Sequence, residues 1–149
     1  MTTTAPPADS RLIGRAHYAS RAVLEHFLAR HGATFLQQLT LRATVLADGP
    51  LELDALVEQI AGSLKNDPAD VLRTVDELLA KGLLAADGTR VGPTDAGHEL
   101  IAAVLAETGG STARIYAGIP PEDLAAAGRV LVHVTERAEA ELAVLDGQS

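Results

Sequence analysis

The sequence predicts an all-α protein that carries one small β-hairpin. Hydrophobic residues make up 47% of the 149 residues but aromatic residues only 3%, so the core must consist of Leu, Val, Ile and Ala, which suit packed helices. Apolar residues recur at helical spacing along most of the chain, and one Asp-Gly pair lies between two short apolar runs. We predict a single domain over residues 10–145, with a disordered N-terminal tail at 1–9 and a short C-terminal tail at 146–149.

The first half of the chain is predicted to form four helices separated by turn-forming residues. Each predicted helix ends where glycine or proline interrupts the apolar pattern. The predicted ranges are 10–30, 35–47, 53–61 and about 66–81. The third helix is expected to break near Gly62-Ser63. The fourth has the strongest start signal, because Asn66 or Asp67 can cap it and Pro68 suits the first helical position.

The second half adds the hairpin and two further helices. The short runs on either side of Asp87-Gly88 are predicted to be strands, because Asp-Gly is favoured in two-residue hairpin loops. The segment Thr94-Asp95-Ala96-Gly97 then starts a fifth helix, which Gly109-Gly110 is expected to interrupt. A last helix is predicted from Pro120-Pro121 to about Leu145.

Charge and composition exclude several classes of function. The formal net charge of −8 argues against non-specific nucleic-acid binding, and residues 51–97 alone carry nine acidic and four basic side chains. The absence of cysteine excludes disulfides, thiol catalysis and Cys-ligated zinc. The N-terminus lacks the pattern of a signal peptide, and no apolar run approaches the roughly 20 residues that span a bilayer. We therefore expect a cytoplasmic protein with no membrane partner.

The sequence contains no recognisable catalytic or metal-binding motif. The histidines do not follow H-x-x-x-H or H-E-x-x-H spacing, and there is neither a G-x-S-x-G motif nor a phosphate-binding glycine loop. We therefore expect no metal site, no cofactor and no catalytic residue. Enzymatic activity stays open only as part of the alternative given below.

The order of the predicted elements, together with three segments, resembles the MarR family of ligand-responsive bacterial transcriptional regulators. The segments are residues 39–46 (LTLRATVL), 75–84 (VDELLAKGLL) and 94–97 (TDAG). The resemblance extends over nearly the whole chain, about residues 10–145. It implies a winged helix-turn-helix at 35–93, flanked by dimerisation helices at 10–31 and 94–145.

The resemblance also implies a function. Members of this family place a recognition helix in the major groove and a wing in the minor groove, and they hold a small molecule between the dimerisation and DNA-binding parts. We therefore expect a ligand-responsive transcriptional regulator that binds double-stranded operator DNA as a homodimer. Its ligand would be a small organic molecule, such as an aromatic acid.

Two departures from the family pattern keep alternatives open. The hairpin is short and offers Arg90 where the family usually has an Asp-Arg-Arg motif. The part of the chain expected to contact DNA, which we call the reading head, is acidic over residues 51–97. One alternative is a MarR-fold protein that has lost DNA binding and acts as a small-molecule binder or enzyme. Another is a protein-binding antagonist that pairs with a second regulator.

The DNA-contacting candidates lie around the fourth helix and the hairpin: Lys65, Asn66, Arg73, Thr74 and Arg90. Arg73 could bind a guanine edge and Thr74 a thymine methyl group or a phosphate. Arg90 lies next to the hairpin tip, where a wing reaches a narrow minor groove. Alternatively, Arg73 pairs with Glu77 one turn later on a solvated face.

The ligand-binding candidates are His17, Tyr18, Arg21, His98 and Tyr116. A cation and a hydrogen-bonding ring on the first helix could hold an acidic aromatic compound against apolar walls. The competing interpretation is that His17 borders the dimer seam, that Arg21 is exposed, and that His98 and Tyr116 serve packing.

Overall fold

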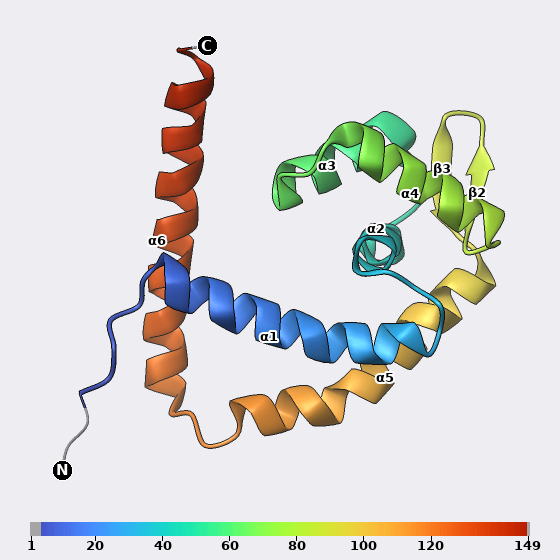
Figure 1. Cartoon of the computed structure of the whole chain (residues 1–149). Helices are drawn as coiled ribbons and strands as arrows, with labels where there is room; N and C mark the ends of the chain where they lie inside the picture. Colours follow the sequence, from blue (N-terminus) through green and yellow to red (C-terminus); the bar gives the residue numbers. More distant parts are fainter. Residues whose placement is uncertain (1–3, 149) are drawn as a thin grey trace. The chain divides into compact units, whose positions relative to one another are not determined.

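The computed structural model describes residues 4–148, in which six α-helices and a three-stranded antiparallel sheet are formed (Figure 1). The helices are α1 (Ser10–Ala29), α2 (Phe35–Leu46), α3 (Leu53–Leu64), α4 (Pro68–Ala80), α5 (Asp95–Tyr116) and α6 (Pro121–Asp146). The strands are β1 (Leu51–Glu52), β2 (Leu84–Asp87) and β3 (Arg90–Pro93). The predicted fold class, mostly helical with a small hairpin, is confirmed.

The chain divides into two compact units, and the boundary falls within α5, between Ser111 and Thr112. The first unit contains α1 to α4, the sheet and most of α5, and the second contains the end of α5 and α6. Residues 4–9 form no helix or strand, whereas residues 1–3 and 149 of the two predicted tails lie outside the described residues. In the described part of the chain, no helix is long and apolar enough to cross a membrane.

The starts of α2 and α4 follow from their capping residues. The Thr34 hydroxyl accepts a hydrogen bond from the Gln37 amide (3.1 Å), and the Gln37 side chain accepts one from the Thr34 amide (3.2 Å), which together form a capping box. At α4 the Asp67 carboxylate accepts a hydrogen bond from the Ala69 amide (2.9 Å), and Pro68 takes the first helical position. The start predicted for α4 is therefore confirmed.

Two predicted helix breaks are wrong. Helix α3 continues through Gly62-Ser63 to Leu64, and α5 continues through Gly109-Gly110 to Tyr116. A glycine inside a helix costs only about 1 kcal/mol relative to alanine, which the buried faces of both helices can offset. The real ends carry left-handed backbone instead, at Lys65 (φ 55°) after α3 and at Gly118 (φ 79°) after α5.

The sheet confirms the hairpin but differs from the prediction in two respects. Asp87 pairs with Arg90, so the two-residue loop is Gly88-Thr89 rather than Asp87-Gly88. Gly88 has a φ of 62°, the left-handed conformation that glycine tolerates at the first loop position. The sequence did not predict β1, which pairs with β3 and sets Glu52 opposite Arg90, because a two-residue strand has no periodic signal.

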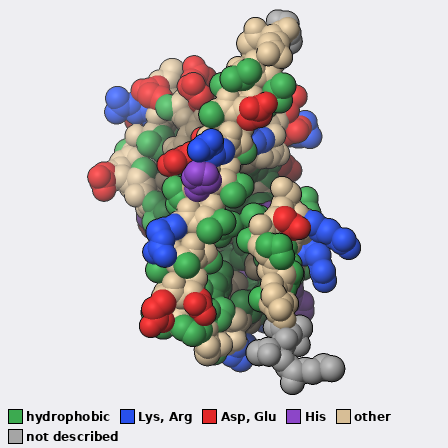
Figure 2. Space-filling model, turned by 90° about the vertical axis from the view of Figure 1, so that its left-hand side faces the viewer, with side chains coloured by type: hydrophobic (Ala, Val, Ile, Leu, Met, Phe, Trp, Pro, Cys, Tyr) green, Lys and Arg blue, Asp and Glu red, His purple; other side chains and the backbone are tan. Residues whose placement is uncertain are grey.

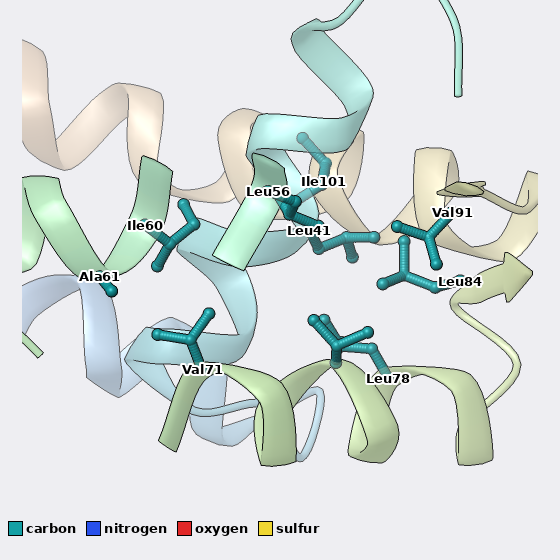
Figure 3. Packing of buried hydrophobic residues seen from close by; sticks show 10 residues of the cluster. Leu41, Leu56, Ile60, Ala61, Val71, Leu78, Leu84, Val91 and Ile101 are labelled. Carbon is teal, nitrogen blue, oxygen red and sulfur yellow. The ribbon is translucent and has the colours of Figure 1, made fainter. Parts of the chain in front are cut away.

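The hydrophobic core lies in the first unit, between α2, α3, α4, the sheet and the start of α5 (Figure 3). Helix α4 contributes Val71, Val75 and Leu78, which follow helical spacing and are fully buried. The other core residues are Leu41, Leu56, Ile60, Ala61, Leu84, Val91 and Ile101. Because α4 is buried on this face alone, its opposite face is left for other contacts.

The segment from Thr94 to Gly97 fixes the chain where it leaves the hairpin and starts α5. The Thr94 hydroxyl donates to the Gly82 carbonyl (2.6 Å) and accepts from the Gly97 amide (3.1 Å). A Cβ atom at Gly97 would overlap the carbonyl oxygen of Leu83, so only glycine allows this close approach. Local structure therefore explains why threonine and glycine occur at this spacing.

Candidate nucleic-acid interface and ligand site

Helices α3 and α4 pack against each other, joined by the turn at residues 65–67, and the β2–β3 hairpin follows α4 (Figure 1). This order is that of a helix-turn-helix followed by a wing. The face of α4 opposite the core exposes Ala69, Leu72, Arg73, Asp76, Glu77 and Ala80. The exposed face thus offers one cation beside two carboxylates.

Arg73 and Thr74 are neighbours in sequence but lie on different sides of α4. The Arg73 side chain is 69% exposed and forms an ion pair with Asp70 (2.6 Å) rather than with Glu77. An exposed pair of this kind contributes little to stability, so the guanidinium can exchange its partner. Thr74 is only 4% exposed, and its hydroxyl donates to the Asp70 carbonyl (2.9 Å). Thr74 therefore lies on the core side of α4 and is not available for contact with DNA.

Lys65 and Asn66 form the turn between α3 and α4, and both are exposed. The Lys65 ammonium group donates to the Gly62 carbonyl (2.7 Å), and the Asn66 amide donates to the Ala61 carbonyl (3.1 Å). These contacts satisfy carbonyls at the C-terminal end of α3. The two predicted residues are therefore next to α4, in the turn that precedes it.

The wing tip holds Arg90, whose side chain is 62% exposed, beside a carboxylate from β1. The Arg90 Nε donates to one oxygen of Glu52 (3.0 Å) and the Thr89 hydroxyl donates to the other (2.7 Å). The hydrogen bonds from Thr89 and Arg90 hold the pKa of Glu52 below its usual value. Sequence reasoning missed Glu52 because β1 was not predicted.

Two of the predicted ligand-binding residues, His17 and Arg21, contact Phe35, the first residue of α2, and a third, Tyr18, contacts His17. The ring of His17 lies 5.4 Å from that of Tyr18 and 6.4 Å from that of Phe35, measured between centroids. The Arg21 guanidinium lies 4.1 Å from the Phe35 centroid, and its Nε donates to Glu25 (3.0 Å). Phe35 was not predicted, because the sequence does not show how α1 and α2 pack.

The other two predicted ligand-binding residues lie elsewhere. His98 lines a separate pocket of about 290 Å³, together with Thr44 and Asp48. Tyr116 ends α5, is exposed and belongs to the second unit. In the described residues, no three His, Asp or Glu side chains come close enough to hold a metal ion.

The fold matches solved structures of transcriptional regulators, although no protein-family model and no curated protein matches the sequence. Transcriptional regulator PA3341 aligns with a TM-score of 0.72 at 20% identity, over 87% of this chain and 96% of its own. CouR from Rhodococcus jostii RHA1, solved with p-coumaroyl-CoA, has a TM-score of 0.70 at 18% identity, covering 83% and 88%. The reduced form of MarR from E. coli has a TM-score of 0.68 at 17% identity, covering 87% and 95%. The chain therefore has the MarR-type winged helix-turn-helix fold that the sequence predicts.

Proposed function

We propose that this protein is a transcriptional regulator that binds operator DNA as a homodimer and is released by a small organic ligand. The observation that carries the proposal is the placement of two exposed arginines. Arg73 lies on α4 and Arg90 on the wing, the two elements that this fold offers to DNA. The similarity in fold to structures named as transcriptional regulators supports the same conclusion.

In the proposed complex, α4 enters the major groove and the hairpin follows the minor groove. Arg73 contacts a base edge, for which guanine is the usual partner, and Arg90 binds in or beside the minor groove. Lys65 and Asn66 contact the sugar-phosphate backbone from the turn before α4. Both arginines now pair with exposed carboxylates, and a base edge for Arg73 or the DNA backbone for Arg90 can replace these partners at little cost.

The proposed dimer rests on an apolar stripe along α6. The stripe has nearly heptad spacing and consists of Leu124, Ala127, Leu131, Val134, Ala138, Leu142 and Leu145. None of the described α6 residues is buried, and Figure 2, which faces this helix, shows hydrophobic side chains along its surface. Exposed apolar surface of this extent is typical of an interaction site. A second copy of the chain covers it in the proposal and supplies a second α4 for the other operator half-site.

The proposed ligand is a planar organic acid bound beside Phe35. Its carboxylate would replace Glu25 on the Arg21 guanidinium, and its ring would lie among Phe35, His17 and Tyr18. That CouR was solved with p-coumaroyl-CoA supports the aromatic ring of the proposed ligand, although the acyl group of that compound is a thioester rather than a carboxylate. If the ligand binds more tightly to an arrangement of the two reading heads that does not fit DNA, it shifts the population away from the DNA-binding state.

DNA binding is tested by enriching bound duplexes from a random pool and titrating the enriched sequence. Arg73→Ala should relax the base preference, whereas Arg90→Ala should weaken binding to all sequences alike. For each half-site, loss of a cation that neutralises a phosphate should lower the slope of log affinity against log salt by about 0.9, and we expect this loss for Arg90→Ala. Arg42→Ala is the control, because it removes an exposed charge from α2, outside α4 and the wing. If Arg73→Ala and Arg90→Ala both bind like the wild type, the proposed interface is wrong.

A second candidate function is a MarR-fold protein without DNA binding that acts on or binds a small molecule. The observation that favours it is the charge of residues 51–97, which contain nine acidic side chains and only four basic ones. Arg73 and Arg90 are ion-paired, and the Lys81 ammonium group donates to the Gly32 carbonyl (2.6 Å). Failure to enrich any DNA sequence, combined with ligand-dependent thermal stabilisation, would establish this candidate in place of the first.

A further inference from the structure

An open apolar groove of about 590 Å³ lies between α3 and the first turns of α4. Its apolar lining comes from Val57 and Ala61 of α3 and from Ala69 and Leu72 of α4. Leu72 lies in the second turn of α4 and is 43% exposed. These side chains offer no hydrogen bonds to base edges, so the proposed function does not account for the groove.

Two carboxylates border the same groove. Asp54 and Glu58 both line it, are exposed, and lie four residues apart on α3. Neither makes an ion pair with another described residue, and no lysine or arginine is among the described residues that line the groove. Like charges at this spacing repel each other, and both repel DNA phosphates. A cationic group from outside the chain would relieve this repulsion.

We propose that the α3/α4 groove is a docking site for a short amphipathic helix of a protein partner. The helix places apolar side chains against Val57 and Leu72, and two basic side chains one turn apart against Asp54 and Glu58. Helices bind apolar grooves in this way, through residues spaced three and four apart. The two carboxylates select basic partners and reject acidic ones. The groove is small, so the contact is weak and exchanges readily.

Docking at this groove goes beyond the proposed function and does not depend on it, whereas its effect on DNA binding rests on the proposed interface. Ala69 and Leu72 belong to the exposed face of α4, which is the face proposed for the major groove. A partner helix bound there therefore excludes DNA from the same head. The partner would act as a competitor of DNA rather than as part of the DNA complex.

The test uses two fluorescent helical peptides that share one leucine face. One peptide carries lysines on both sides of this face and the other carries glutamates, and binding to the full chain is followed by polarisation without DNA. The lysine peptide should bind at least tenfold more tightly than the glutamate peptide. Leu72→Ser, and separately the pair Asp54→Asn with Glu58→Gln, should each weaken it at least fivefold. The controls are Leu46→Ser on α2 and the pair Asp48→Asn with Glu99→Gln, all exposed and outside the groove; both should bind like the wild type.

Three outcomes would overturn the docking site. If the control pair Asp48→Asn with Glu99→Gln weakens the lysine peptide as much as the groove pair does, the attraction is due to net charge alone. If Leu72→Ser binds like the wild type, the apolar groove is not occupied. If Leu72→Ser lowers the mass in light scattering, the occupant is a second copy of this chain. Circular dichroism of Leu72→Ser shows whether the variant is folded, and the carboxylate pair provides the decision if it is not.

Discussion

Glu52 determines how much positive charge the wing tip presents. Its carboxylate binds both Thr89 and Arg90, and these contacts lower its pKa. A carboxylate whose pKa is lowered by folding keeps its contacts above its ordinary pKa and loses them only as the pH falls through the lower folded pKa. The ion pair between Glu52 and Arg90 is therefore intact at neutral pH, and DNA binding should not change through protonation of Glu52 between about pH 6 and 8.

Replacing Glu52 by glutamine should strengthen DNA binding. Glu52→Gln keeps the shape and an acceptor for Thr89 but removes the charge that competes with phosphate for Arg90. We expect higher affinity and a salt slope that is steeper by up to about 0.9 for each half-site, measured by fluorescence anisotropy across a salt series. The gain should disappear when Arg90→Ala is added. An equal gain with and without Arg90 would show that the effect is general charge rather than release of this arginine.

Arg21 distinguishes ligand binding from packing on α1. It is partly exposed and makes an ion pair with Glu25 and a cation–π contact with Phe35, so Arg21→Ala should change the ligand-free melting temperature little. In the wild type, a bound aromatic carboxylate should stabilise the fold by about 2.7 kcal/mol at one hundred times Kd. Arg21→Ala should lose this stabilisation in a thermal-shift screen.

Glu25→Gln is the matched control for the ligand site. It frees the guanidinium from its present partner, so acidic ligands should stabilise this variant at least as well as the wild type. If Arg21→Ala melts much earlier than the wild type without ligand, Arg21 serves packing and the ligand site lies elsewhere.

Residue positions could be predicted from the sequence only where local periodicity decides them. The exposed positions of Arg73 and Arg90 follow from the helical pattern and from the hairpin signal. Thr74 follows the same helical spacing as the core residues Val71 and Leu78, so its burial could have been predicted. Its hydroxyl group favoured DNA contact only when the position in the helix was ignored. Glu52 could not be predicted, because it meets Arg90 across 38 residues of sequence.

At the level of elements, capping residues located the start of α4, and the glycines at 32 and 82 marked the ends of α1 and α4, whereas glycines inside α3 and α5 did not break those helices. The start of α4 agrees with the prediction because Asp67 and Pro68 act within one turn. The predicted breaks at Gly62-Ser63 and Gly109-Gly110 are wrong, because burial on the other side of each helix outweighs a local preference of about 1 kcal/mol. The sequence shows the local preference of glycine against a helix directly. The burial that outweighs this preference is known only from the structure.

Continuity of α5 can be tested at Gly109. This glycine is exposed and helical, and a Cβ atom there would meet no other atom within 4 Å. Gly109→Ala should therefore raise the free energy of unfolding by about 0.5–1 kcal/mol, because alanine loses less backbone entropy in a helix. Urea denaturation measures the change. Gly97→Ala is the contrasting variant, since a Cβ there overlaps Leu83 and should destabilise the protein. A loss of stability in Gly109→Ala would indicate that α5 bends at this point.

For the whole molecule, the position of the apolar surface indicates how the protein assembles, which its composition does not. The 47% of hydrophobic residues was sufficient to predict a packed helical core. It could not show that the core is confined to the first unit and that α6 buries none of its described residues. The helical spacing of α6 was visible in the sequence, but only the structure shows that none of its described residues is buried. This exposed face is why assembly is expected to decide the stability of the second unit.

The proposed dimer predicts a mass of twice 15.5 kDa in light scattering at micromolar concentration. Leu131 lies on the apolar stripe and is 45% exposed in the single chain, whereas its neighbour Val132 is 58% exposed and points about 100° away from it around the helix. Leu131→Glu would bury a charge between two copies of α6 and should shift the protein to monomers, because an unpaired buried charge is far costlier than an exposed one. Val132→Glu adds the same charge off the stripe and should remain dimeric. A wild-type mass of 15.5 kDa would refute the dimer, and an equal response of the two variants would place the interface away from the stripe.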